Sequence, residues 1–257
     1  MFTIWKIKMR NSQSTLGSGE DESRNYIRRD AITDEGLNHF LEAYPGEHIT
    51  KRDLFYYVYG ILHSEEYRTR YANNLRKELP RIPRVATAED FWNFSHSGKE
   101  LGDMHVNFEK GDMYPAELLF KCPEMAAHNP EKFYRVEKMK FSGKRPVQDK
   151  TMIIYNEYIT VSGIPLEAYD YIINGKTAIG WVMDCQQVKT DKASGIRNDP
   201  NNWAVETIGN ARYPLDLLLR VINISLETQR IVNALPVLRL YHGDAPFEAK
   251  NVGDNDA

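Results

Sequence analysis

The sequence predicts an α+β fold, in which an N-terminal helical part packs with a small mixed or antiparallel sheet and a long C-terminal helix. Apolar residues recur at helical spacing between residues 31 and 106, which predicts a run of amphipathic helices. The period then changes: residues 133–141 alternate weakly, and residues 152–161 are rich in β-branched and aromatic side chains, as strands are. A last apolar stripe begins at Pro214 and runs to about Leu235, which predicts the long helix.

In the first part, each expected helix begins after a polar residue that can cap its N-terminus. Thr50 is followed three positions later by Asp53, where an acid favours a helix start. After Ser64 the apolar stripe continues to Leu79, so we expect that helix to run as far as Pro80. The expected caps are Thr33, Thr50, Ser64 and Thr87.

The second part is expected to mix strands and helices. Residues 108–131 contain several Gly and Pro residues and are expected to be irregular. The two strand-like segments flank residues 143–146, which predicts a hairpin with a basic connection. A helix is expected over residues 177–186, with these side chains buried: Ile179, Trp181, Val182 and Met183.

Along the chain we expect three parts. Residues 1–30 are interpreted as a strand-like segment and a flexible linker, because residues 11–22 are rich in Ser, Gly and acids without periodicity. Residues 31–240 are expected to form the main domain, helical over 31–106 and α+β over 107–240. Residues 241–257 are expected to form a flexible tail.

The composition argues against several classes of protein. A net charge of -3 over 257 residues is neither that of a polycation nor that of an acidic tail. Two distant cysteines, Cys122 and Cys185, argue against a disulfide scaffold or a structural zinc site and fit a reducing compartment. No apolar run approaches the ~18 residues of a membrane span, and the N-terminus does not have the pattern of a signal peptide. We therefore expect a cytoplasmic protein.

Two short segments are strongly basic. Residues 68–84 contain six basic residues and one acid, and residues 132–150 contain seven basic residues and two acids. Each segment is either a solvated face or a surface that contacts an anionic partner. For a nucleic-acid partner, the candidate phosphate contacts are Arg68, Arg76, Lys77, Arg81, Arg84, Lys138, Lys140, Lys144 and Arg145.

Residues 186–203 have no periodic apolar face and are dense in amide and basic side chains. One interpretation is a solvated loop with an Asx-turn. The other is a DNA-reading loop, because amides and basic groups with bidentate reach recognise base edges. Trp203 is expected to be a packing anchor for this loop. The candidate base-reading residues are Gln186, Gln187, Lys189, Lys192, Ser194, Arg197, Asn198 and Asn202.

Catalytic patterns are scarce. The sequence contains no GxGxxG, P-loop, HExxH or GxSxG pattern. Asp170 followed by Gln187-Val188-Lys189 resembles the acid and (E/Q)xK arrangement of Mg²⁺-dependent nucleases, although a Gln is a poor metal ligand. We therefore expect no catalytic residues and no metal site, and keep a nuclease as a distant alternative.

Several ordered blocks of the sequence resemble one family. They include KRDLFYYVYGILHS at 51–64, LPRIP at 79–83, GKEL at 98–101, HVNFE at 105–109, ITVSGIP at 159–165, and QVKTDKASGI at 187–196 with NDP at 198–200. Over about residues 31–235 the chain resembles the C-terminal specificity domain of Type ISP restriction-modification enzymes. These are single-chain enzymes with nuclease, helicase-like translocase, adenine methyltransferase and target-recognition parts.

The resemblance implies a non-catalytic module that recognises a double-stranded DNA target for a methyltransferase and an ATP-dependent translocase carried elsewhere. Its expected partners are double-stranded DNA and the methyltransferase and helicase domains of the same system. No cofactor is expected in this chain, although the full-length enzymes use S-adenosylmethionine, ATP and Mg²⁺. The alternative is a coupling domain between methyltransferase and helicase with little DNA affinity. Tyr56, Tyr57 and Tyr59 are either a docking surface or half-buried core.

Overall fold

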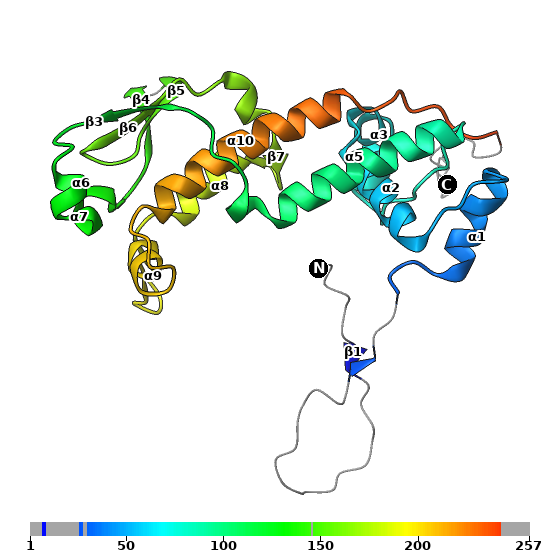
Figure 1. Ribbon diagram of the computed structural model, residues 1–257, viewed down its shortest axis with the longest axis horizontal. Coiled ribbons are helices and arrows are strands. Elements are labelled where there is room, and N and C mark those ends of the chain that lie inside the picture. The colour runs from blue at the N-terminus through cyan, green and yellow to red at the C-terminus, as the bar shows by residue number, and fades with distance from the viewer. Residues whose placement is uncertain (1–6, 9–25, 28–29, 145, 243–257) are drawn as a thin grey trace, which may run out of the picture. The chain divides into compact units, whose positions relative to one another are not determined.

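The computed structural model describes residues 7–8, 26–27, 30–144 and 146–242 (Figure 1). Its helices are α1 (Asp34–Ala43), α2 (Lys51–His63), α3 (Glu65–Arg70), α4 (Ala72–Leu75), α5 (Ala88–Val106), α6 (Met125–His128), α7 (Pro130–Tyr134), α8 (Ala178–Cys185), α9 (Pro200–Glu206) and α10 (Tyr213–Asn233), with 3-10 turns η2 (Phe108–Lys110) and η3 (Leu166–Tyr169). Its strands are β1 (Ile7–Lys8), β2 (Tyr26–Ile27), β3 (Glu117–Phe120), β4 (Lys140–Lys144), β5 (Val147–Ile154), β6 (Ile159–Ser162), β7 (Ile172–Ile173), β8 (Lys176–Thr177), β9 (Lys189–Thr190) and β10 (Arg197–Asn198).

The chain divides into two compact units. Among the described residues, the first comprises those up to Gly98 and those from Pro236 onward, and the second comprises those from Lys99 to Leu235. The predicted α+β class is confirmed, with an antiparallel sheet and a long C-terminal helix, α10. The expected division at residues 30, 106 and 240 stays a prediction. None of the helices in the described part of the chain has the length and apolar composition that a membrane span requires.

In the first unit, the expected caps begin the helices. Thr33 Oγ1 accepts from the backbone N–H of Gly36, and Thr50 forms a reciprocal capping box with Asp53. Ser64 and Thr87 cap α3 and α5 in the same way. These local hydrogen bonds explain why the helix starts follow directly from the sequence.

The third helix is shorter than expected. It ends at Arg70, Tyr71 leaves helical geometry with φ -107° and ψ 18°, and α4 ends at Leu75. Leu79, which was expected on the buried stripe, is 89% exposed. Pro80 disfavours helical geometry at the residue before it, so Leu79 lies outside the helix. Its helical spacing from Leu75 therefore does not place it on the buried face.

An extended segment, residues 81–85, is held by tyrosine hydroxyls. Each hydroxyl donates to a backbone carbonyl at 2.7 Å, and the accepting residues alternate along the segment, which is the spacing at which carbonyls of extended chain point the same way. The pairs are Tyr67 with Arg81, Tyr57 with Pro83, and Tyr44 with Val85.

In the second unit, strands β3, β6, β5 and β4 form an antiparallel sheet in that order. Figure 1 shows α8 and α10 lying along one side of this sheet. Ile153 pairs with Val161 across β5 and β6, and both are fully buried. The core between the sheet and the two helices also contains Ile159, Ile164, Ile179, Val182, Leu215, Leu218 and Ile222.

The predicted hairpin with a basic connection is confirmed as β4–β5, but its surroundings differ from expectation. The segment expected to be irregular contains β3, α6 and α7, and Phe133 lies in α7 instead of a strand. The strand expected over 152–161 is two strands, β5 and β6. Asn156 separates them, because its Oδ1 accepts from the N–H groups of Tyr158 and Ile159 and closes a tight turn.

The helix expected over 177–186 is confirmed as α8, with Thr177 as its cap. Its expected burial is wrong at one position: Trp181 is 40% exposed, while Ile179, Val182 and Met183 are buried. The Trp181 indole donates to the carbonyl of Ile173 at 2.7 Å, so its polar edge is bound at the surface.

The close approach of α2 and α5 generates a prediction. A Cβ at Gly98 would stand 1.9 Å from the carbonyl oxygen of Tyr56. Because that atom belongs to the backbone of α2, a helix would have to move to relieve the clash. We expect Gly98→Ala to lower the free energy of unfolding by about 3 kcal/mol or more. Gly111→Ala is the matched control, because its Cβ meets nothing nearer than 3.8 Å. Thermal melting that leaves both variants equally stable would contradict this helix contact.

Candidate nucleic-acid interface

The recognition hairpin, which we define as residues 189–198, is a two-stranded antiparallel ribbon. Thr190 pairs with Arg197, and Lys189 pairs with Asn198. Opposite residues of an antiparallel pair share one face, so Lys189 and Asn198 lie on one face and Thr190 and Arg197 on the other. Every residue of the hairpin is exposed. The segment expected to be a loop is therefore ordered but keeps its polar side chains at the surface.

The tip of the hairpin is closed by Asp191. Its Oδ1 accepts from the N–H groups of Ala193 and Ser194 and from the Ser194 hydroxyl. Gly195 occupies the left-handed region at φ +71°, where a residue without Cβ carries no steric cost. The Ser194 N–H holds the pKa of Asp191 below its ordinary value, with further lowering by the Ser194 hydroxyl. The tip is thus fixed by its own hydrogen bonds.

The base of the hairpin is attached to residues 135–137. The Val188 N–H donates to the carbonyl of Glu137 at 3.0 Å. Just beyond the hairpin, the Asn201 amide pairs with the backbone of Val136: its Oδ1 accepts from the Val136 N–H and its Nδ2 donates to the Val136 carbonyl, both at 2.9 Å. Both residues are buried. The Val188 hydrogen bond and the Asn201 pairing together hold both ends of the hairpin against residues 135–137.

Asp199 lies at the same junction. Its Oδ1 accepts from the N–H and the Nδ2 of Asn201, which caps α9. Its Oδ2 lies 2.5 Å from Arg135 Nη2 and 3.5 Å from Arg197 Nη2. Burial raises the pKa of Asp199, but hydrogen bonds from Arg135 and Asn201 together outweigh it and keep the pKa below its ordinary value. The carboxylate is therefore charged at neutral pH.

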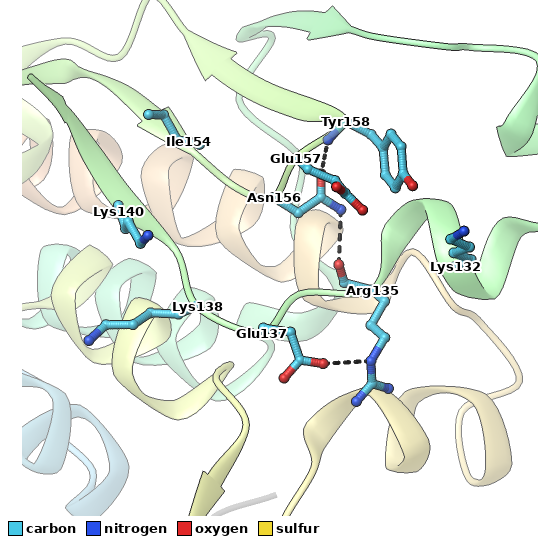
Figure 2. A pocket seen from close by; sticks show the side chains of 9 residues that line it. All are labelled: Lys132, Arg135, Glu137, Lys138, Lys140, Ile154, Asn156, Glu157 and Tyr158. Carbon is cyan, nitrogen blue, oxygen red and sulfur yellow. Dashed lines mark hydrogen bonds and ion pairs between the residues drawn. The ribbon is translucent and has the colours of Figure 1, made fainter.

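A basic pocket of about 560 Å³ lies beside this junction (Figure 2). In this view Lys138 and Lys140 stand on one side, and Lys132 and Arg135 on the other. The lining contains four basic and two acidic side chains, and its complete set is Lys132, Arg135, Glu137, Lys138, Lys140, Ile154, Asn156, Glu157 and Tyr158.

The wall of the pocket is tied to the turn between β5 and β6 by side-chain hydrogen bonds. The Asn156 Nδ2 donates to the carbonyls of Phe133 and Arg135, at 2.8 and 2.9 Å. Arg135 is held by Glu137 as well as by Asp199. Within the described part of the chain Lys132, Lys138 and Lys140 form no ion pair, so their charges are available to an anionic ligand.

The basic surface continues from the pocket to the hairpin. The pKa of Asp184 lies below its ordinary value chiefly because Lys176 hydrogen-bonds its carboxylate, and the charges of Lys189 and Lys138 add to the effect. Lys138 lines the pocket and Lys189 belongs to the recognition hairpin. Since the Val188 N–H also donates to the carbonyl of Glu137, which lines the pocket, the hairpin base adjoins the pocket.

The predicted base-reading residues separate into two groups. Lys189, Lys192, Arg197, Asn198 and Asn202 are exposed. Gln187 is buried and its Nε2 donates to the carbonyl of Asp184, and the Gln186 side-chain oxygen is shielded from solvent. Ser194 bonds Asp191 at the tip. The structure brings the first group together around the hairpin and turns the two glutamines inward.

The predicted phosphate contacts lie in both units. Arg68, Arg76, Lys77 and Arg81 are exposed in the first unit, and Arg81 pairs with Glu78. Arg84 is half-buried, with its guanidinium over the Tyr241 ring and Nη1 bonded to the His39 carbonyl. Lys138, Lys140 and Lys144 are exposed in the second unit, while Arg145 lies outside the described residues.

The predicted aromatic docking surface is largely buried. Tyr56 is 1% exposed and Tyr57 is fully buried, with its ring stacked on Phe91 at 4.7 Å. Only Tyr59 of the three is half-buried. Tyr56 and Tyr57 belong to the core of the first unit because they lie on the face of α2 that turns toward α5, and they offer no surface to a partner.

Sequence reasoning missed Arg135, Asp199 and Asn201, because it interpreted Asp199-Pro200 as a turn. The same pair is also the signature of a helix start, with an acid at the N-cap and Pro at the first helical position. α9 begins there and carries Trp203, which contacts Tyr213 edge-on at 5.3 Å but stays 44% exposed.

The distant nuclease alternative rested on Asp170 and Lys189. Both side chains are exposed. A group of three or more His, Cys, Asp or Glu side chains placed to hold a metal ion is not found among the residues that the structure describes.

Comparison with known proteins defines the class of this chain. The family described as the Type ISP C-terminal specificity domain matches residues 8–217. Comparison with curated protein sequences gives no match. The chain belongs to the Type ISP C-terminal specificity domain family, which is the targeting part of a larger enzyme and not its catalytic part.

Three solved structures are similar. A nuclease-deletion mutant of the Type ISP restriction-modification enzyme LlaGI, in complex with a DNA substrate mimic, is 42% identical with a TM-score of 0.64 over 76% of this chain. The ATP-dependent enzyme LlaBIII bound to DNA is 35% identical, with a TM-score of 0.70 over 87%. A DrdV–DNA complex is 31% identical, with a TM-score of 0.68 over 85%. This chain spans 17%, 14% and 21% of their respective lengths.

The Asn201–Val136 pairing generates a prediction for stability. Asn201→Ala leaves a buried N–H and a buried carbonyl of Val136 without their partner, so we expect a loss of about 2 kcal/mol or more in the free energy of unfolding. The neighbouring Asn202 is exposed, and Asn202→Ala should stay within about 0.5 kcal/mol of the parent. Urea denaturation measures both, and equal midpoints would contradict the anchoring role.

Proposed function

We propose that this chain binds duplex DNA and reads a short target sequence through the recognition hairpin. The observation that carries the proposal is a fixed, exposed two-stranded ribbon with basic and amide side chains beside a basic pocket. The major groove of B-DNA admits a two-stranded ribbon, and its base edges are read by such side chains. DNA complexes of similar enzymes support the proposal.

Each face of the ribbon has its own reading chemistry. Asn198 is suited to the N6 and N7 edge of adenine, and Lys189 on the same face to guanine O6 and N7. Arg197 on the opposite face is suited to bidentate contact with guanine. Lys192 at the tip and Asn202 on α9 are further candidates.

The pocket lysines supply the sequence-independent part of binding. Lys132, Lys138 and Lys140 are unpaired within the described residues and would neutralise backbone phosphates, which fixes the register of the ribbon. Further candidates for phosphate contact are Lys144 and the exposed basic residues of the first unit, Arg68, Arg76, Lys77 and Arg81.

In the complete system, the module would position the target for an adenine-N6 methyltransferase and an ATP-dependent translocase carried elsewhere. Those activities would use S-adenosylmethionine, ATP and Mg²⁺, and this chain would need no cofactor. A coupling domain with little DNA affinity is less well supported, because Tyr56 and Tyr57 of the aromatic patch on which that alternative rested are buried, and Tyr59 is half-buried.

The first test is selection of bound duplexes from a random pool at about 150 mM salt, where non-specific phosphate contacts are partly screened. We expect enrichment of one asymmetric motif. Binding without enrichment that disappears as salt rises would contradict sequence reading by this chain.

Phosphate contact by the pocket predicts a salt effect. Lys138→Ala with Lys140→Ala should weaken binding to target and non-target duplexes alike. It should also reduce the slope of log K against log salt by about 2, because each lost phosphate contact removes about 0.9. Fluorescence anisotropy titrations at several salt concentrations measure the slope. Lys110→Ala, an exposed lysine outside the pocket, is the control and should leave the slope unchanged.

A substitution in the hairpin should affect sequence preference and not the salt dependence of binding. Asn198→Ala should cost about 1–3 kcal/mol on the target duplex only, with the salt slope retained. An equal loss on every duplex would remove Asn198 from the base-reading residues and assign it to the backbone.

A further inference from the structure

Asp199 follows directly on the recognition hairpin and is largely shielded from solvent. Its side chain is 9% exposed, whereas that of Arg197 is 60% exposed. The two carboxylate oxygens have separate contacts: Oδ1 holds Asn201 at the start of α9, and Oδ2 faces the guanidinium groups of Arg135 and Arg197. One half-buried acid therefore joins the hairpin, the helix that follows it and the basic pocket.

The contact with Arg197 restrains a side chain that is otherwise solvated. A guanidinium has five N–H donors in a fixed plane, so a carboxylate that engages one edge leaves donors free for a bidentate contact with guanine. Holding the group in place before binding reduces the conformational entropy that recognition loses. Arg135 lies nearer to the same oxygen, at 2.5 Å against 3.5 Å, and fixes the position of the carboxylate that Arg197 contacts.

We infer that Asp199 is a positioning residue that sets the base preference of the hairpin by orienting Arg197. The inference rests on the proposed function and adds to it a residue that does not contact a base. It also assigns a role to Arg135, which lines the pocket and fixes Asp199 at the hairpin base.

Asp199→Asn separates this role from a structural one. Asparagine caps helices about as well as aspartate and keeps an acceptor for Asn201, so α9 should remain intact. Its amide nitrogen in place of Oδ2 cannot accept from either arginine. Glu137→Gln is the matched control, because Glu137 also pairs with Arg135 and loses the same charge, whereas among the described residues Arg197 pairs with Asp199 and not with Glu137.

The experiment measures affinity for the selected target and for duplexes with single base-pair changes. Arg197→Ala should flatten the preference at one base pair, and Asp199→Asn should reduce the preference at that same pair by about tenfold. The double variant should lose no more than Arg197→Ala alone, because a residue that acts through Arg197 has nothing to orient without it. Glu137→Gln should shift all affinities together and retain every preference.

The outcomes separate the inference from the proposed function. A parent chain that selects no target overturns both. A parent chain that selects a target, with Asp199→Asn keeping its preference or adding its loss in full to that of Arg197→Ala, overturns the inference alone. Thermal melting checks that the variants fold; should Asp199→Asn not fold, Asp199→Ser retains a capping oxygen that does not reach the arginines and is held to the same outcomes.

Discussion

The two hydrogen bonds between the Asn201 amide and the Val136 backbone join the segments on which the candidate interface is built. Residues 135–137 carry the pocket arginine and lead into Lys138 and Lys140, while residues 188–201 carry the recognition hairpin. A side-chain amide that replaces a strand partner satisfies the buried backbone of Val136 on both sides. The groups proposed to contact phosphates and to read bases are thereby held in one register, which a flexible loop of the same composition would not provide.

Several acidic residues of this region are engaged in contacts within the chain, although Asp184 and Asp191 stay exposed. Asp184 binds Lys176, Asp191 closes the hairpin tip, and Asp199 is enclosed by arginines and Asn201. These carboxylates are partly neutralised by their partners, while Lys132, Lys138 and Lys140 form no ion pair among the described residues, so the pocket offers positive charge although the chain has a net charge of -3. An anionic ligand is therefore attracted by local arrangement and not by overall charge.

Local signals were sufficient for most helices, because the cap and the apolar stripe of a helix both lie in its own stretch of sequence. They failed where the deciding contact is distant or the element is very short. The pairing of Arg135 with Asp199 spans 64 residues, and the two-residue strands β9 and β10 are too short to show a period. The sequence therefore located the candidate site at residues 186–203 but did not show which side chains face outward: Gln187 turned inward, and Asp199 was interpreted only as part of a turn.

The tyrosine hydroxyls that hold residues 81–85 have a consequence for how this segment can change. Their acceptors are carbonyls of every second residue, so inserting or deleting one residue would direct all the following carbonyls to the opposite side of the chain. A two-residue change would keep the carbonyls facing the hydroxyls. Length variation in this connection should therefore be confined to even steps, a restriction that apolar packing alone would not impose.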